Sequence, residues 1–391
     1  MTVVRVRDIA EQIRGVTFSK GEASAVREAG YIPVLTASNI TDDGLQLKSL
    51  LYVPESKVAI RQRLRQGDLV VTASSGSLSV VGRAALVTAP LDAAFGAFCK
   101  VLRPNQHVEP RFLAHFFRTP SYRARVSRLA AGANINNLRN EDLDDLVVPL
   151  PPLPEQRRIA DILDRADDLR AKRRRALALL DLFVESLYVA MFSSGAIGSA
   201  TAVTRKLSAV AKIKSGSTPN RKHAEFFGGG IPWVKTTEVH GDLILATEES
   251  VSVEGQKAAR LQLFPVGSIV IAMYGQGKTR GQSAILGIDA AVNQACAVIL
   301  PSEHFVVEFM GQQIRLSYER LRAKAQGGNQ ANLNLGLVGD LDVLVPSIED
   351  QRDFVQQAKL VDELRINQTL ELARLDELFA SLQHRAFQGE L

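Results

Sequence analysis

Residues 149–192 read PLPPLPEQRRIADILDRADDLRAKRRRALALLDLFVESLYVAMF, and this stretch has the pattern of one long helix. Pro154 stands where a first-turn proline is tolerated, and Ser193-Ser194-Gly195 is typical of a helix end. A helix from Pro154 to Phe192 would be about 58 Å long at about 1.5 Å per residue. Apolar residues recur within it at alternating spacings of three and four, which predicts a coiled-coil seam with Arg173 at one seam position. The apolar seam positions are Ile159, Ile162, Ala166, Leu169, Ala176, Leu180, Phe183, Leu187 and Ala190.

The same pattern returns at the end of the chain, in residues 346–387. Adding 195 to the residue numbers of the first stretch brings identical residues into one register, including Gln156 with Gln351, Asp167 with Asp362, Arg170 with Arg365, Leu180 with Leu375 and Phe192 with Phe387. We therefore predict an internal pseudo-two-fold repeat, in which each half is a globular segment followed by a long helix. The two helices are expected to run antiparallel, because each leaves one globular segment and must return towards the other.

The predicted organisation has four parts. Residues 1–148 form the first globular domain, 149–195 the first long helix, 199–345 the second globular domain, and 346–391 the second long helix. Shared landmarks support the repeat: Ile32-Pro33 answers to Ile231-Pro232, and Cys99 answers to Cys296. Neither globular segment shows the regular strand–helix alternation of a doubly wound fold, so we expect an α+β class with mixed sheets.

The first globular segment carries several strand-like runs and one helical run. A short entry strand at Val3–Val6 is followed by a helical turn at Asp8–Ala10. The further strands are expected at Tyr31–Leu35, Leu50–Val53, Asp68–Ala73, Val80–Val87 and Phe95–Leu102, and a helix is expected at Pro110–Arg128.

Composition sets broad limits on the function. The 391 residues carry a formal net charge of +5, which is compatible with polyanion binding without requiring it. The only two cysteines, Cys99 and Cys296, fall at corresponding places in the two halves, so we expect two buried, reduced thiols in a cytoplasmic protein. The N-terminus lacks the apolar core of a signal peptide, and no apolar run is long enough to span a membrane.

Catalytic motifs are weak. Residues 272–279, AMYGQGKT, match the loose form of a phosphate-binding loop, but a strand-like run follows where a helix is required. We therefore expect a glycine-rich hairpin tip there. The six histidines form no metal-ligand cluster, and we find no nucleophile elbow, carboxylate pair or dinucleotide fingerprint. The chain is expected to be non-catalytic, with no metal and no cofactor of its own.

A basic run, Arg170–Arg175, lies within the first long helix. It suits either a solvated helix face whose arginines pair with acids on the partner helix, or contact with phosphate.

Polar loop side chains able to reach base edges or phosphates are plentiful in both globular segments. The candidates in the first are Thr36, Ser38, Asn39, Ser74, Ser75, Ser77, Arg83, Asn134, Asn136 and Asn137. The candidates in the second are Lys214, Ser215, Thr218, Asn220, Arg221, Lys222, Lys235, Thr236, Thr237, Tyr274, Gln276, Lys278, Arg280, Asn329, Gln330 and Asn332.

The whole chain resembles the specificity (S) subunit of type I restriction-modification systems. The resemblance rests on residues 149–159, PLPPLPEQRRI, and on residues 231–237, IPWVKTT, which follow KSGSTP at 214–219. It implies two target-recognition domains that each read one half of a split double-stranded DNA sequence, with the helix pair setting the gap between the halves. It also implies two modification subunits docked on the helices, and a restriction subunit. S-adenosylmethionine, ATP and Mg are expected on those partners.

Two other functions stay open at this point. One is a stand-alone, modification-dependent enzyme, which the missing methyltransferase and nuclease motifs disfavour. The other is a repeat-built scaffold that binds protein partners rather than DNA.

Overall fold

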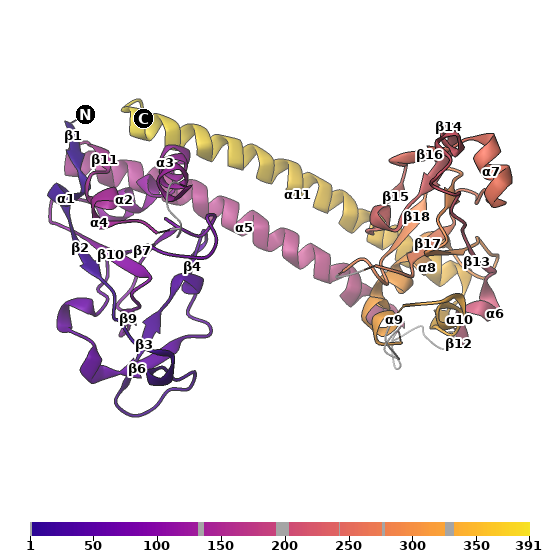
Figure 1. The fold of residues 1–391 in the computed structure, drawn as a ribbon, viewed down its shortest axis with the longest axis horizontal. Helices are drawn as coiled ribbons and strands as arrows, with labels where there is room; N and C mark the ends of the chain where they lie inside the picture. The colour runs from indigo at the N-terminus through magenta and orange to yellow at the C-terminus, as the bar shows by residue number, and fades with distance from the viewer. Residues whose placement is uncertain (1, 132–136, 193–202, 242, 276–277, 325–331) are drawn as a thin grey trace. The chain divides into compact units, whose positions relative to one another are not determined.

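The computed structural model describes residues 2–131, 137–192, 203–241, 243–275, 278–324 and 332–391 (Figure 1). By its internal contacts the chain divides into two compact units. The first unit comprises Met1–Arg175 with Thr369–Leu391, and the second comprises Ala176–Gln368. Each unit therefore contains part of the helix α5 (Leu153–Phe192) and part of the helix α11 (Ile348–Gln388).

The first unit is built on two sheets. Four antiparallel strands follow the order β2 (Ala10–Arg14), β10 (Cys99–Pro104), β7 (Leu69–Thr72) and β8 (Ala84–Leu86). A mixed sheet follows the order β6 (Leu51–Pro54), β3 (Tyr31–Leu35) and β9 (Ala94–Phe95), with β3 and β9 parallel. Two smaller pairs are β1 (Thr2–Arg5) with β11 (Val147–Leu150), and β4 (Ile40–Thr41) with β5 (Gly44–Leu45).

The second unit repeats this plan, with five strands instead of four in its larger sheet. Its larger sheet follows the order β13 (Ile213–Ser215), β20 (Cys296–Ile299), β17 (Ile269–Ala272), β18 (Ser283–Leu286) and β15 (Leu243–Ile244). Its smaller sheet follows the order β16 (Glu249–Val251), β14 (Phe227–Val234) and β19 (Ala291–Val292), and β12 (Val203–Lys206) pairs with β21 (Asp342–Val345). The predicted α+β class and internal repeat are confirmed.

Short helices cover these sheets. In the first unit they are α1 (Val6–Ile9), α2 (Pro110–Phe116), α3 (Pro120–Ala131) and α4 (Asn140–Asp144). In the second they are α6 (Leu207–Val210), α7 (Val253–Ala259), α8 (Val307–Leu316), α9 (Tyr318–Lys324) and α10 (Leu335–Gly339). The single helix predicted over Pro110–Arg128 is wrong in one respect: it breaks at Phe117–Thr119, because the residue before Pro120 is disfavoured in helical conformation.

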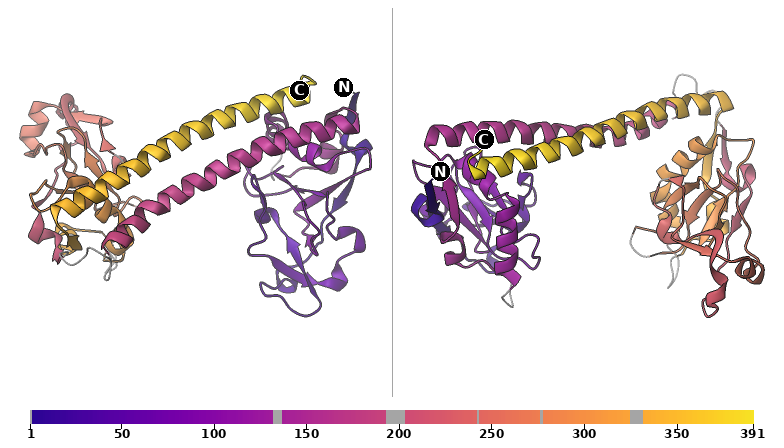
Figure 2. Two further views of the ribbon diagram at one scale, coloured as in Figure 1. Left: turned by 180° about the vertical axis from the view of Figure 1, so that it is seen from behind. Right: turned by 90° about the horizontal axis from the view of Figure 1, so that it is seen from above.

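The long helices are part of the globular cores. In the first unit Ile159 and Leu163 of α5 are fully buried in one cluster with Phe112 of α2 and with Phe379 and Ala386 of α11. The start of α5 therefore lies beside the end of α11, which makes the helices antiparallel there (Figure 2). Burying side chains of this size stabilises the unit by about 2 kcal/mol each.

The second unit shows the reverse pairing of helix ends. Phe192 at the end of α5 and Phe354 at the start of α11 both pack on Phe309 of α8, with ring centroids 5.2 and 5.7 Å from it. The end of α5 thus meets the start of α11, as antiparallel helices require.

Each long helix is fixed to its unit by a buried glutamine. Gln156 Oε1 accepts a hydrogen bond from the Glu109 amide (2.9 Å), and its Nε2 donates to the carbonyls of His107 (3.1 Å) and Pro151 (2.9 Å). Gln351 makes the same three bonds in the second unit. Its partners there are Val306 N (2.7 Å), His304 O (3.2 Å) and Pro346 O (2.9 Å).

The residues predicted to form the apolar seam of α5 are only partly on its covered face. Every second predicted position is covered, and several of the positions between them are exposed. Ile159, Ala166, Arg173, Leu180 and Leu187 are all buried or half-buried, as predicted. Leu169 and Phe183, by contrast, are 51% and 53% exposed. The neighbouring residues Leu163, Arg170, Leu177, Val184 and Met191 lie on the covered face instead.

The cause of the shift is visible at Arg170. Its guanidinium lies 4.3 Å from the centroid of the Phe379 ring on α11, and its Nε donates to Asp376 at 2.6 Å. Arg170 stacks on Phe379 and pairs with Asp376 at the same time, and so takes the position facing α11 that was predicted for Leu169. Arg174 also reaches Asp376, at 3.3 Å, and Lys172 pairs with Asp168 at 2.7 Å. For these three residues of the basic run, the structure favours pairing with acids.

No helix among the described residues is both long enough and apolar enough to cross a membrane.

Candidate nucleic-acid interface

In the first unit a tight turn at Gly96–Phe98 joins loops that are far apart in sequence. The Gly96 amide donates to Leu35 O (2.8 Å), and the Ala97 amide donates to Val16 O (2.9 Å). The Phe98 carbonyl accepts from the amides of Ala73 (2.8 Å) and Ser74 (3.1 Å). The turn was predicted to lie inside one continuous strand over Phe95–Leu102, and that prediction is wrong because the turn separates β9 from β10.

A further segment joins the same place. The Leu138 amide donates to Ala73 O at 2.8 Å, and Asn137 forms an isolated bridge with Ser74. The ammonium of Lys100, on β10, donates to Leu138 O at 2.8 Å. Burial lowers the pKa of Lys100, partly opposed by the nearby charges of Asp142 and Asp144. The loops after β3 and β7 and the segment before α4 therefore converge on one turn.

The second unit has the same junction at Asn293–Ala295. The Asn293 amide donates to Val234 O (3.0 Å), and the Ala295 carbonyl accepts from the Met273 amide (2.8 Å). The Leu333 amide in turn donates to Met273 O (3.1 Å). The backbone frame is shared, while the side chains on it differ.

Close backbone approach at these junctions requires glycine. A Cβ on Gly15 would lie 2.1 Å from Gly96 O, and a Cβ on Gly216 would lie 1.9 Å from Val292 O. Gly216 belongs to the stretch KSGSTP, so the glycine of this motif lets the chain after β13 pass close to Val292, the residue before the turn.

In the first unit, several candidate residues hold the loops in shape. Asn39 is buried: its Oδ1 accepts from the Thr36 amide (2.9 Å), and its Nδ2 donates to Gln46 O (2.8 Å) and Lys48 O (3.1 Å). Thr36 Oγ1 lies 2.9 Å from Ser38 Oγ. Asn39 is therefore a loop-closing residue, whereas Ser38 on the 3-10 turn Ala37–Asn39 is exposed.

The β7–β8 loop holds the other candidates of this unit. Ser74 and Ser75 are half-buried, and Ser77 is exposed with its hydroxyl 2.9 Å from that of Ser79. Arg83, at the far side of the loop, pairs with Asp42 at 3.3 Å.

In the second unit a charged cluster fixes the start of the β14 region. Arg221 pairs with Glu249 at 2.6 Å and lies over the rings of Phe227 (4.6 Å) and Trp233 (5.1 Å). Lys235 reaches Glu248 (2.8 Å) and Glu249 (3.0 Å). The hydrogen bonds from Arg221 and then Lys235 lower the pKa of Glu249, so these two cations serve the fold.

Other candidates of the second unit present side chains outward. Tyr274 is 41% exposed on the β17–β18 loop. Lys214 is exposed with its ammonium on Gln262 Oε1 at 2.9 Å, and the Asn220 side chain accepts from the Lys222 amide at 3.1 Å. The remaining exposed candidates are Ser215, Lys222, Thr237, Lys278 and Asn332, while Thr218, Thr236 and Arg280 are half-buried.

The glycine-rich segment after β17 does not enter a helix. It connects β17 to β18, which pair antiparallel, so the predicted hairpin is confirmed and the phosphate-binding loop is excluded. The candidates Asn134, Asn136, Gln276, Asn329 and Gln330 lie outside the described residues.

The sequence did not reveal two exposed apolar residues, one on the first junction turn and one on the β7–β8 loop. Phe98 is 69% exposed on the turn, and Leu78 is 44% exposed on the β7–β8 loop. A glycine inside a strand-like run, here Gly96, was the signal that could have revealed the turn.

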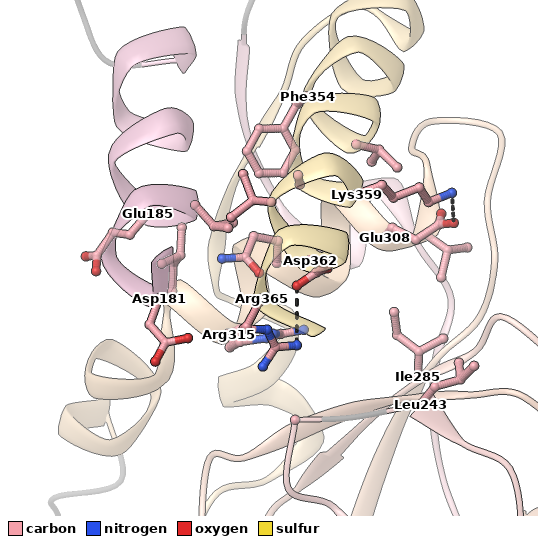
Figure 3. A pocket seen from close by; sticks show the side chains of 18 of the residues that line it. Asp181, Glu185, Leu243, Ile285, Glu308, Arg315, Phe354, Lys359, Asp362 and Arg365 are labelled. Atoms are coloured by element: carbon pink, nitrogen blue, oxygen red, sulfur yellow. Dashed lines mark hydrogen bonds and ion pairs between the residues drawn. The ribbon is translucent and has the colours of Figure 1, made fainter. Parts of the chain in front are cut away.

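A groove of about 830 Å³ lies elsewhere in the second unit, between α8 and α11 (Figure 3). Its lining includes Ile285 of β18, Phe354 of α11, and Asp181 and Glu185 of α5. Lys359 pairs with Glu308 at 3.4 Å, and Arg365 with Asp362 at 3.3 Å. The groove reaches the Leu286 end of β18, whereas the β17–β18 loop lies at the Ser283 end. The groove and the candidate loop are therefore at opposite ends of that strand.

The corresponding helices of the first unit, α2 and α5, are joined by charges. Arg111 pairs with Asp164 (3.0 Å), His115 Nε2 lies 2.7 Å from Asp164, and Arg118 pairs with Asp167 (2.7 Å). The matched helices thus carry different contacts in the two units.

Among the described residues, no group of three or more His, Cys, Asp or Glu side chains is arranged to hold a metal ion. Cys99 and Cys296 are buried free thiols.

Comparison with known proteins shows which family the sequence matches. The family described as "Type I restriction modification DNA specificity domain" matches residues 1–178 and 201–376. The type I restriction enzyme StySPI specificity subunit of Salmonella potsdam is 26% identical over 99% of this chain and 88% of its own length. The EcoKI specificity subunit of Escherichia coli K12 is 36% identical over 47% of this chain and 41% of its own.

Solved structures agree with the fold. One chain, from work on complex assembly and conformational transition of the type I R-M system, matches with a TM-score of 0.66 at 18% identity, over 100% of this chain and 98% of that one. The type I restriction-modification S subunit from M. genitalium matches with a TM-score of 0.57 at 17% identity, over 99% and 96%. At these identities the likeness concerns the fold.

Proposed function

The chain belongs to the family of type I restriction modification DNA specificity domains, and on that premise we propose that it is the DNA-recognition subunit of such a system. Each unit reads one half of a bipartite duplex target with the loops that meet at its junction turn. The chain itself catalyses neither methylation nor cleavage.

The observation that carries the proposal is the shared junction with different side chains. Equivalent backbone bonds join Ala73 to Phe98 in the first unit and Met273 to Ala295 in the second, and the next loop residues are Ser74 and Tyr274 respectively. Backbone sharing preserves the geometry of the loops, and side-chain divergence changes what they contact. That combination suits two half-sites of different sequence.

The exposed side chains supply suitable chemistry. Hydroxyl groups such as those of Ser77 and Thr237 donate to and accept from base edges, and Lys222 and Lys278 reach phosphate as cations. Asn39, Arg221 and Lys235 are excluded from this role because their polar groups already serve the fold. The recognition set is therefore smaller than the sequence candidates.

The long helices suit protein partners. Large apolar side chains stay exposed along them, and helices that expose many apolar residues are suited to bind protein partners. These residues are Leu169, Leu370 and Leu378 in the first unit, and Leu179, Leu182, Phe183, Val189, Leu360, Leu364 and Ile366 in the second. We assign them to docking of two modification subunits, which would bring S-adenosylmethionine. A restriction subunit would bring ATP and Mg, and the assembly would act on DNA in the cytoplasm.

A salt titration tests DNA binding. Affinity of the chain, alone and assembled with its modification subunit, for a fluorescent duplex is measured between 50 and 200 mM salt. Because each phosphate contact releases counterions, log Kd should rise linearly with log salt, with a slope of about 0.9 per contact. Absence of duplex binding, with intact binding of the modification subunit, would favour a scaffold for proteins alone.

A further inference from the structure

The ring of Phe98 is exposed where burial would be favourable. It is 69% exposed, although hiding a phenyl group from water is worth about 2 kcal/mol. The exposure of the ring does not result from a poorly bonded loop, because the backbone of the turn Gly96–Phe98 makes four hydrogen bonds to three other segments. The hydrogen-bonded turn fixes the Phe98 side chain in an exposed position.

The fold does not need this ring. Ala295 occupies the same place in the second unit, and its carbonyl accepts the same bond from the start of the β17–β18 loop. A methyl group therefore satisfies the turn. The aromatic side chain of Phe98 must be explained by something other than the junction itself.

Each junction nevertheless presents one exposed aromatic ring. The second unit places it at Tyr274, whose counterpart in the first unit is Ser74. The ring thus stands on the turn in one unit and on the neighbouring loop in the other. Leu78, 44% exposed, is a further apolar side chain on the β7–β8 loop, whose first residues bond to the junction turn.

We propose that Phe98 is a specificity-determining residue, whose ring makes an apolar contact to a base in the first half-site, and that Tyr274 plays the corresponding part in the second. The proposal rests on the proposed DNA-recognition function. Apolar side chains contact thymine methyl groups in the major groove and wedge between base steps in the minor groove. Either contact gives sequence preference to a surface whose other exposed groups are mainly polar.

The test uses the chain assembled with its modification subunit and duplexes that carry the motif which this assembly methylates. Phe98→Ala is expected to raise Kd for that motif about tenfold or more, the range for one lost base contact, with little change for a scrambled duplex. Phe98→Tyr should bind within about threefold of the parent. The matched control is Ile60→Ala, which removes an 81% exposed apolar side chain from the same unit outside the junction.

A half-site scan supplies the second readout. With Phe98→Ala, tolerance of altered base pairs should increase only in one half of the motif, and with Tyr274→Ala only in the other. If Phe98→Ala keeps the Kd and base preferences of the parent, the proposal is wrong while DNA recognition stands. If the parent assembly itself does not distinguish motif from scrambled duplex, the proposed function fails first.

Discussion

Replacing Gln351 by Ala should destabilise the second unit by about 3 kcal/mol. The Gln351 side chain is 0% exposed and makes three hydrogen bonds, one accepted from an amide and two donated to carbonyls. Each such bond contributes about 1 kcal/mol, and an alanine leaves its buried partners unpaired. The loss falls where α11 joins the unit.

The assay uses the only tryptophan of the chain as a probe. Trp233 is 1% exposed in the core of the second unit, so its fluorescence reports unfolding of that unit. With a urea dependence of about 2 kcal/mol per molar, a loss of about 3 kcal/mol lowers the midpoint by about 1.5 M. Far-UV circular dichroism, which sees both units, is recorded in parallel.

Gln357→Ala is the matched control, because Gln357 is an exposed glutamine on the same helix. It should leave the tryptophan transition within about 0.3 M of the parent. A Gln351→Ala midpoint that also stays within this margin would refute the claim that this glutamine anchors α11.

Three further predictions follow from other parts of the chain. Inserting four residues after Arg175 and four after Gln368 lengthens each helix by about 6 Å, and the gap between the half-sites in the methylated motif should grow by about two base pairs; an unchanged gap would show that the helices do not set it. Burial raises the pKa of Asp164, but the hydrogen bond and charge of His115 and the contacts with Arg111 outweigh burial and lower the pKa overall. The ionised Asp164 carboxylate therefore stabilises the folded chain above about pH 4, and this stabilisation is lost as the pH falls through the lowered pKa. Asp164→Asn should therefore cost about 1 kcal/mol in urea unfolding at pH 7, discounted for partial exposure, and less below pH 4, and an equal cost at both pH values would contradict the ionic account. Burial raises the pKa of both Cys99 and Cys296 to about 12, so iodoacetamide at pH 8 should label neither in the folded chain and both in urea, and rapid labelling of the folded chain would show that a thiol is accessible.

The duplication and the long helices were predictable because they depend on pattern. Matching residues in one register, such as Gln156 with Gln351, revealed the repeat, and those glutamines anchor the helices through identical bonds. The face of α5 was only half predictable. Hydrophobicity favours Leu169 for the seam, but the contacts of Arg170 with Phe379 depend on where α11 lies.

The candidate interface was harder to predict than the fold. Polar loop residues look alike in sequence whether they face solvent or close a loop, and only the structure separates Asn39 and Arg221 from Ser38 and Thr237. Phe98 was hidden for the opposite reason. An aromatic residue in an apolar run predicts a buried strand, and the turn exists because other segments bond to it.

The central claim is that the two units read separate halves of one target. It is tested most directly by exchanging residues 200–345 for the matching domain of another family member, assembling the product with its modification subunit, and mapping the methylated motif by sequencing. The account predicts that one half of the motif changes while the other half and the gap stay the same. A motif altered in both halves would contradict it.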